Sequence, residues 1–124
     1  MTRRLTPAER LASAAKDVLL ETLAEQSSWD RFLVERAVFH YGTRHDKWSA
    51  NDLRDVLPEL AHGFLGAVIN SLRTAGIIAH TGRVVPSTLD STHGHRIALW
   101  TLTAKGHAIA DERTARAQQK RAAA

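Results

Sequence analysis

The chain has 124 residues, of which 44% are hydrophobic, and it contains no cysteine. This length fits a single domain with a small core, and the lack of thiols excludes disulfides and thiolate metal sites. No apolar run reaches the roughly 18 residues of a membrane-spanning helix, and no apolar signal core follows the basic N-terminus. We therefore expect a cytoplasmic protein with no membrane partner.

Positive charge is concentrated in the second half of the chain. The formal net charge is +4 and the sequence pI is about 10.1. Residues 1–42 are balanced and residues 43–60 carry −1, whereas residues 61–102 carry +2 and residues 103–124 carry +3. A basic surface of this kind suits binding to phosphate, although the same charges are also consistent with ordinary solubilising charge.

The first part of the chain predicts two helices. Thr6-Pro7-Ala8-Glu9 is a capping box with proline at the first helical position, which starts a helix at about 7–25. One apolar face follows at helical spacing, made of Leu11, Ala15, Val18, Leu19 and Leu23. Ser27 and Ser28 predict a break. A second, largely buried helix is expected at about 29–41, ended by Gly42.

From Trp48 onward, the pattern predicts two further helices joined by a turn. Ser49 and Asp52 have the spacing of a capping box for a short helix at about 50–57, which Pro58 ends. A second helix is expected at about 61–75, followed by Gly76 as its C-terminal cap. Its buried stripe has helical periodicity and consists of Leu65, Val68, Ile69 and Leu72.

Two strand-like segments come next, at 77–85 and 96–102, and a polar loop at 86–95 separates them. Such a pair predicts a β-hairpin. Thr103 can then cap a last helix at about 104–112. The segment 113–124 has no apolar residue larger than alanine, so we expect a basic tail that is frayed or disordered.

Helix, tight turn, helix and two-stranded hairpin is the element order of a winged helix-turn-helix. We therefore expect a mainly α fold with a small β-hairpin (α+β), with extra N-terminal and C-terminal helices, in a single domain over residues 1–112. In this fold the helix at 61–75 is the recognition helix, whose outer face enters the major groove of DNA. The loop at 86–95 is the wing.

A resemblance supports this interpretation. The segment Trp100-Thr-Leu-Thr-Ala-Lys-Gly-His-Ala-Ile-Ala resembles the end of the wing and the next helix in MarR- and PadR-type regulators. The stretch from Ser49 to Trp100 also resembles small winged-helix proteins of phages and prophages, with a Gly-His near the wing before a strand that ends in Trp. The resemblance covers about half of the chain. It implies a regulator of transcription, phage-encoded in the second case, and a homodimer built by the N- and C-terminal helices.

Nine residues are candidates for contacts with double-stranded DNA. Guanidinium groups present a planar fork to phosphate oxygens, and asparagine matches the edge of adenine. The candidates are Arg44, Lys47, Asn51, His62, Asn70, Arg73, Arg83, His95 and Arg96. For each of them, a solvated surface side chain is the alternative interpretation.

The sequence predicts neither an enzyme nor a metal site. The pair of His93 and His95 lacks a third ligand, and no nucleophile elbow, phosphate loop or His-Glu-x-x-His motif is present. We therefore expect no catalytic residue and no cofactor. Because the recognition helix is poor in Arg and Lys, an alternative function stays open. The chain would then be a protein-interaction module that binds a host polymerase or replication component, without DNA specificity of its own.

Overall fold

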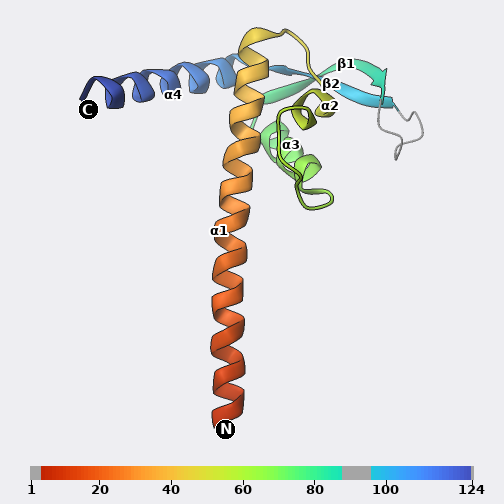
Figure 1. The fold of residues 1–124 in the computed structure, drawn as a ribbon. Helices are drawn as coiled ribbons and strands as arrows, with labels where there is room; N and C mark the ends of the chain where they lie inside the picture. The colour runs from red at the N-terminus through yellow and green to blue at the C-terminus, as the bar shows by residue number, and fades with distance from the viewer. Residues whose placement is uncertain (1–3, 88–95, 124) are drawn as a thin grey trace. The chain divides into compact units, whose positions relative to one another are not determined.

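The computed structural model describes residues 4–87 and 96–123. The elements follow in the order α1 (Pro7–Arg44), α2 (Ala50–Arg54), α3 (Phe64–Thr74), β1 (Ile78–Pro86), β2 (Arg96–Leu102) and α4 (Ala104–Ala123) (Figure 1). The chain divides into two compact units, Met1–Phe32 and Leu33–Ala124, so that the boundary falls inside α1. In the described ranges, no helix combines the length and apolarity needed to cross a membrane.

The predicted α+β class is confirmed, because helices hold most of the described residues and β1 pairs antiparallel with β2. The hairpin runs from the pair Ile78–Leu102 to the pair Pro86–Arg96. Trp48 adds an isolated bridge to the other edge of β2: its N–H donates to Trp100 O at 3.0 Å, and its carbonyl oxygen accepts from Trp100 N at 2.7 Å. The hairpin is therefore anchored to the segment that leads into α2.

The core of the second unit lies between the last turns of α1, α2, α3 and the hairpin. The predicted stripe of α3 is buried in it, together with Trp48. Burial of each large apolar side chain stabilises the fold by about 1.5–3 kcal/mol. The most completely buried large side chains are Trp48, Leu53, Leu72, Ile78, Val34 and Val38. This packing turns one face of α3 inward and leaves the opposite face in solvent.

The predicted break in the first helix is wrong, because α1 continues through Ser27 and Ser28. Serine lowers helix propensity only slightly, and Gln26 Nε2 donates to Asp30 Oδ1 at 2.9 Å across the serine pair. The segment at about 29–41 was expected to be largely buried, and this is wrong for its first residues. The Trp29 side chain is 56% exposed and that of Phe32 is 44% exposed.

The predicted capping boxes form, and they do so from neighbouring residues alone. At the start of α1, Thr6 N–H donates to Glu9 Oε2 and Glu9 N–H donates to Thr6 Oγ1, both at 3.1 Å. At the start of α2, Ser49 N–H donates to Asp52 Oδ2 at 2.8 Å. These contacts satisfy N–H groups that have no partner within a helix.

Gly42 does not end α1, as the sequence suggested, but lies inside it. A Cβ at this position would be 3.0 Å from Leu102 Cβ, so the small residue lets β2 pack directly on the helix. The helix ends at Arg44, whose Nη1 donates to His40 O at 3.1 Å. Tertiary packing therefore explains the glycine at position 42 better than helix termination does.

The remaining helix boundaries also differ from the prediction. α2 ends at Arg54, and α3 begins at Phe64 after Gly63, whose φ of 78° is left-handed. Of the two expectations for the tail, the disordered one is wrong for the described residues, since α4 continues to Ala123. That this end of the helix frays stays a prediction. Residues with high helix propensity fill this segment, and Arg116 pairs with Glu112 one turn away.

Candidate nucleic-acid interface

The exposed face of α3 carries small and polar side chains. Because the stripe from Leu65 to Leu72 points into the core, the residues between its members face solvent. The exposed ones are Gly66, Ala67, Asn70, Arg73 and Thr74. A helix with a slim outer face can enter a major groove about 12 Å wide. This face is therefore the candidate surface for contact with bases.

Asn70 and Arg73 act as a pair on this face. Arg73 Nη2 donates to Asn70 Oδ1 at 3.1 Å, and Thr74 Oγ1 donates to Asn70 O at 3.0 Å. The contact orients the Asn70 side chain and joins it to the guanidinium group of Arg73. Both residues were predicted as DNA contacts, and the structure places them side by side on one exposed helix face.

His62 lies just before α3, in the loop that connects it to α2, and is exposed. This loop borders a surface hollow of about 630 Å³. The hollow is lined by polar residues that include Arg54 and Glu59, and by apolar residues that include Leu57, Leu60 and Leu65. His62 is thus near the start of the exposed α3 face, although on a separate segment of the chain.

Asn51 has structural partners that the sequence did not reveal. Its Nδ2 donates to Ser87 Oγ at 3.3 Å, and its Oδ1 accepts from Arg54 Nη1 at 2.8 Å. The first contact joins α2 to the residue that follows β1, 36 positions along the chain. Asn51 therefore holds the start of the helical motif against the Pro86–Arg96 end of the hairpin, which makes it a weaker candidate for a DNA contact.

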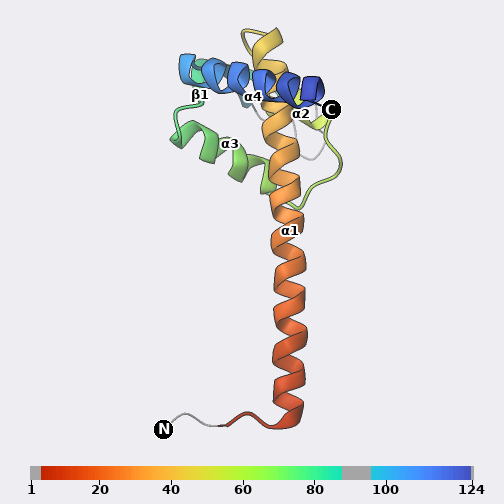
Figure 2. The same ribbon diagram turned by 90° about the vertical axis from the view of Figure 1, so that its left-hand side faces the viewer.

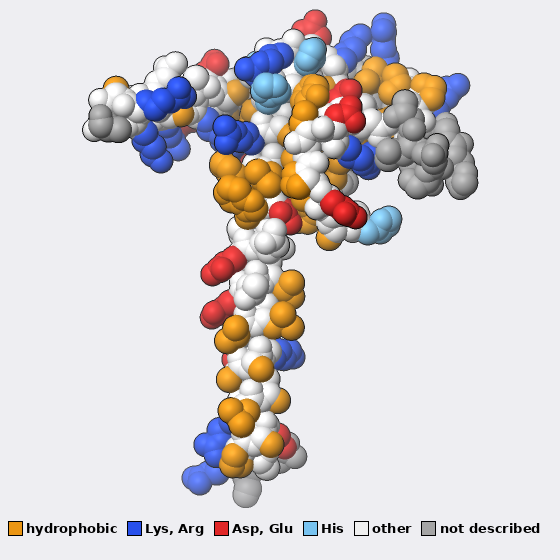
Figure 3. Space-filling view, viewed as in Figure 1, with side chains coloured by type: hydrophobic (Ala, Val, Ile, Leu, Met, Phe, Trp, Pro, Cys, Tyr) orange, Lys and Arg blue, Asp and Glu red, His pale blue; other side chains and the backbone are white. Residues whose placement is uncertain are grey.

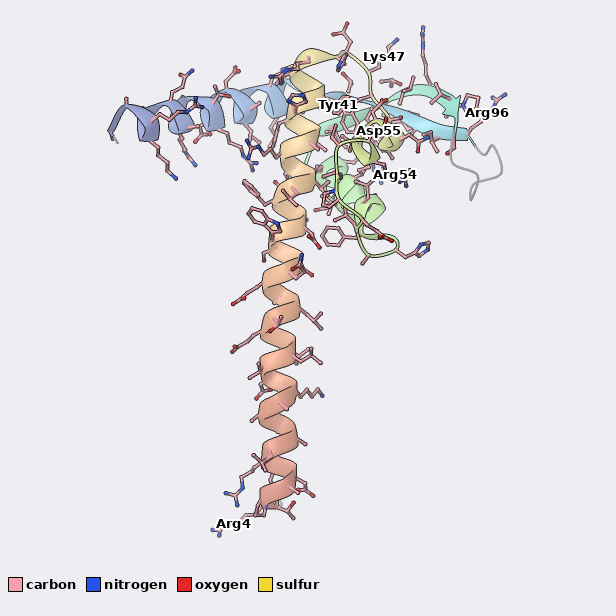
Figure 4. All side chains as sticks on the ribbon, viewed as in Figure 1. Arg4, Tyr41, Lys47, Arg54, Asp55 and Arg96 are labelled. Atoms are coloured by element: carbon pink, nitrogen blue, oxygen red, sulfur yellow. The ribbon has the colours of Figure 1, made fainter. Side chains whose placement is uncertain are left out.

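Arg54 was not among the predicted residues, yet it is exposed on α2 next to Asn51 (Figure 4). The sequence could have indicated Arg54 as a candidate, because it lies three positions after Asn51 and therefore on the same side of the helix. Of the predicted cations that precede α2, Lys47 is exposed in the connection after α1, and Arg44 caps α1 through His40.

Arg83 and Arg96 lie on the hairpin and are exposed. The pairing of β1 with β2 is irregular between His80 and Val84, where Gly82 has a φ of 82°. Thr81 fixes this bulge, since its Oγ1 donates to Leu99 O at 2.9 Å and accepts from Arg83 N–H at 3.2 Å. The bulge thus determines where the Arg83 side chain leaves the strand.

Arg96 is the first residue of β2 and pairs with Pro86, at the end of the hairpin from which the wing extends (Figure 4). His95 lies outside the described residues, as does most of the predicted wing at 86–95. The predicted β-hairpin is therefore present. That Arg83 and Arg96 contact DNA stays a prediction.

Comparisons with known proteins place this arrangement among solved structures. The chain is similar to a PadR-like transcription factor from Bacteroides fragilis, with a TM-score of 0.58 and 18% identity over 81% of this chain and 94% of that one. It is also similar to a protein from Streptococcus mutans, with a TM-score of 0.55 and 15% identity over 73% of this chain and 81% of that one. No family model and no curated protein matches the sequence.

At these levels of identity, the likeness shows a shared fold. The element order and the paired hairpin of this chain are those of a winged helix. The same fold is found in a PadR-like transcription factor. The expectation of a winged helix-turn-helix, drawn from the element order and from the resemblance to PadR-type regulators, is therefore confirmed.

Proposed function

We propose that the protein binds double-stranded DNA in a sequence-dependent manner and regulates transcription. The observation that carries the proposal is the exposed face of α3, with Asn70 and Arg73 paired on it, in the same compact unit as the hairpin of β1 and β2. The similarity to the fold of a PadR-like transcription factor supports it. The proposal includes a cytoplasmic location, and it includes no catalytic activity and no cofactor.

In this proposal, α3 lies in the major groove and supplies the contacts to bases. The amide of Asn70 can donate to an acceptor on a purine edge, while Arg73 can bind a guanine edge or a phosphate. Only these two long polar side chains project from the described part of the exposed α3 face. Direct contacts from α3 would therefore read only a few base pairs. The remaining sequence specificity would come from the shape of the DNA.

The cations outside α3 would bind the phosphate backbone. Arg83 and Arg96 belong to the hairpin, whereas Lys47 and Arg54 lie around the start of the helical motif. Phosphate contacts set the position of a protein on the duplex and are insensitive to sequence. His62 is a further candidate, and His95 would add a contact from the wing.

A second copy of the chain is the proposed partner of the first unit. Its part of α1 exposes large apolar side chains along most of its length (Figure 3). Leu11, Val18 and Trp29 are 74%, 64% and 56% exposed. Val18 follows Leu11 by seven residues and Trp29 follows Val18 by eleven, and both spacings return a side chain to nearly the same face of a helix. These spacings are those of a helix that packs against another helix. The proposed homodimer would bury this face, with α4 as a second contact.

The alternative function, a protein-interaction module, is favoured by one observation: among the described residues of α3, Arg73 is the only cation on the exposed face. In that case, α3 or the hollow next to it would bind a polymerase or replication component instead of DNA. Because the hairpin cations Arg83 and Arg96 have no evident use in this alternative, we prefer DNA binding.

Selection from a pool of random duplexes at low salt would test the proposal. We expect an enriched site, and a palindromic site would indicate that a dimer reads it. A pool that stays random, combined with no shift of any duplex at low salt, would contradict DNA binding. Capture of one defined protein partner under the same conditions would then support the interaction module.

A further inference from the structure

The C-terminal end of α3 is held by the first turn of α4, although Thr103 lies 28 positions after Ala75 in the sequence. α3 itself ends at Thr74 with Ala75 as its cap, and a short turn through Gly76 and Ile77 leads to β1. The turn and α4 contact each other through side chains of the segment that resembles MarR- and PadR-type regulators.

Thr103 contacts the turn through both its backbone and its side chain. Its N–H donates to Ile77 O at 3.0 Å, and its Oγ1 lies 2.6 Å from Gly76 O and 2.9 Å from Ile77 O. The same hydroxyl accepts from Gly106 N–H at 3.1 Å, as a helix cap does. One side chain therefore starts α4 and binds the turn after α3.

Lys105 contacts the end of α3 with a charged group. Its Nζ donates to Ala75 O at 2.7 Å. This carbonyl belongs to the cap of α3, where the helix dipole leaves partial negative charge that an ammonium group stabilises. The lysine is itself exposed, so the contact lies at the surface.

Gly106 permits the close approach. A Cβ at this position would lie 2.3 Å from Ile77 O and 2.7 Å from Leu102 Cδ1, which no real side chain tolerates. Further along α4, Arg113 binds Glu35 at 3.2 Å and lies 4.7 Å from the ring centre of Phe39, both on α1. Figure 1 shows the first turns of α4 beside the last turns of α1, and Figure 2 shows the same crossing from the side. α4 is therefore fixed at one point to α3 and at another to α1.

We propose that Thr103, Lys105 and Gly106 form a clamp that fixes the C-terminal end of α3 on α4, and that they thereby set DNA affinity without touching DNA. The effect on affinity rests on the proposed function. In this role Thr103 and Lys105 are positioning residues for Asn70 and Arg73, which lie on the last turns of the same helix. A change at α4 reaches the DNA-facing helix through this clamp.

The test compares Lys105→Met and Thr103→Val with the matched control Lys120→Met, which removes an equal charge from the exposed far end of α4. Thr103→Ser serves as the conservative variant that restores the hydroxyl. Amide hydrogen exchange of the free protein is measured at Ala75, Gly76 and Ile77, whose N–H groups bond to the last turn of α3. Affinity for duplex DNA is measured in parallel across a range of salt concentrations.

We expect exchange at these three amides to become about tenfold faster in both clamp variants, with no change in Lys120→Met or Thr103→Ser. DNA affinity should fall by about tenfold in both clamp variants. The salt dependence of binding in Lys105→Met should equal that of Lys120→Met, because no phosphate contact is lost with Lys105.

Unchanged exchange would refute the clamp. Faster exchange with unchanged affinity would show a purely structural contact and would refute the positioning role. A salt slope that falls by about one in Lys105→Met alone would show that Lys105 binds phosphate directly, which also contradicts the proposal. If the wild-type chain binds no duplex, the proposed function and the effect on affinity both fail, whereas the exchange measurement still decides the clamp.

Discussion

Gly106 and Gly66 are both helical glycines, yet their surroundings differ. The backbone of Gly106 lies against Ile77 O and Leu102, whereas nothing lies within 4 Å of the place where a Cβ would stand at Gly66. The sequence alone does not distinguish the two. Glycine is required at the first position by close packing and is merely tolerated at the second, where it faces the proposed DNA surface.

We predict that Gly106→Ala lowers the free energy of unfolding by about 1–3 kcal/mol, because the added methyl group has no room. Gly66→Ala is the control and should raise it by up to about 1 kcal/mol through helix propensity. Urea unfolding monitored by circular dichroism measures both. Equal effects of the two substitutions would contradict the packing described for α4.

Arg83 and Arg96 are predicted to contact phosphate. Replacing each with alanine should weaken binding to every duplex alike and reduce the salt slope of the affinity by about one per residue. Arg10→Ala removes the same charge from the first unit and is the control for net charge. A loss confined to one DNA sequence would show that the hairpin reads bases instead.

At the scale of elements, the sequence predicted what neighbouring residues determine. The capping boxes at Thr6 and Ser49 and the stripe of α3 depend on contacts within one or two turns, and all of them are present. The exposed face of α3 followed from the same periodicity. The order of elements then sufficed for the fold.

The remaining features depend on contacts between distant residues. Ser27 and Ser28 suggested a break in the helix. Helix formation is cooperative, however, and the helical segments on both sides of the two serines continue through them. The bond between Asn51 and Ser87 joins residues that no local pattern connects. The packing of Gly42 on Leu102 and the contacts of Arg113 with α1 are of the same kind.

Asn51 offers a direct test of this distinction between a structural and a DNA-binding residue. We predict that Asn51→Ala lowers the free energy of unfolding by about 0.5–1.5 kcal/mol, because it separates α2 from the end of β1. Ser87→Ala should cost a similar amount, and the double variant should cost less than the sum of both. Additive losses in chemical denaturation would contradict the link between these side chains.

At the scale of the whole molecule, we assign DNA binding to the second compact unit and dimerisation to the first. The second unit carries the candidate DNA surface and its own core. The part of α1 in the first unit has its large apolar side chains in solvent. A long helix of this kind gains most of its stability from packing, which is what a second copy of the chain would supply.

We predict that Leu11→Glu combined with Val18→Glu converts a dimer into a monomer at micromolar concentration. Both side chains are largely exposed, so the fold of each chain should be retained. Leu20→Glu, a substitution of a 53% exposed leucine on the other side of the same helix, is the control. Light scattering gives the mass. A wild-type chain that is already monomeric would refute the homodimer.

The central claim is that the exposed face of α3 reads DNA sequence. The most direct test measures the ratio of affinities for the selected duplex and a scrambled duplex of equal length, in the wild-type chain and in Asn70→Ala. We predict that the wild-type chain prefers the selected duplex, and that Asn70→Ala loses about tenfold of this preference while its affinity for the scrambled duplex stays the same. An unchanged ratio in Asn70→Ala, or equal affinity of the wild-type chain for both duplexes, would contradict the claim.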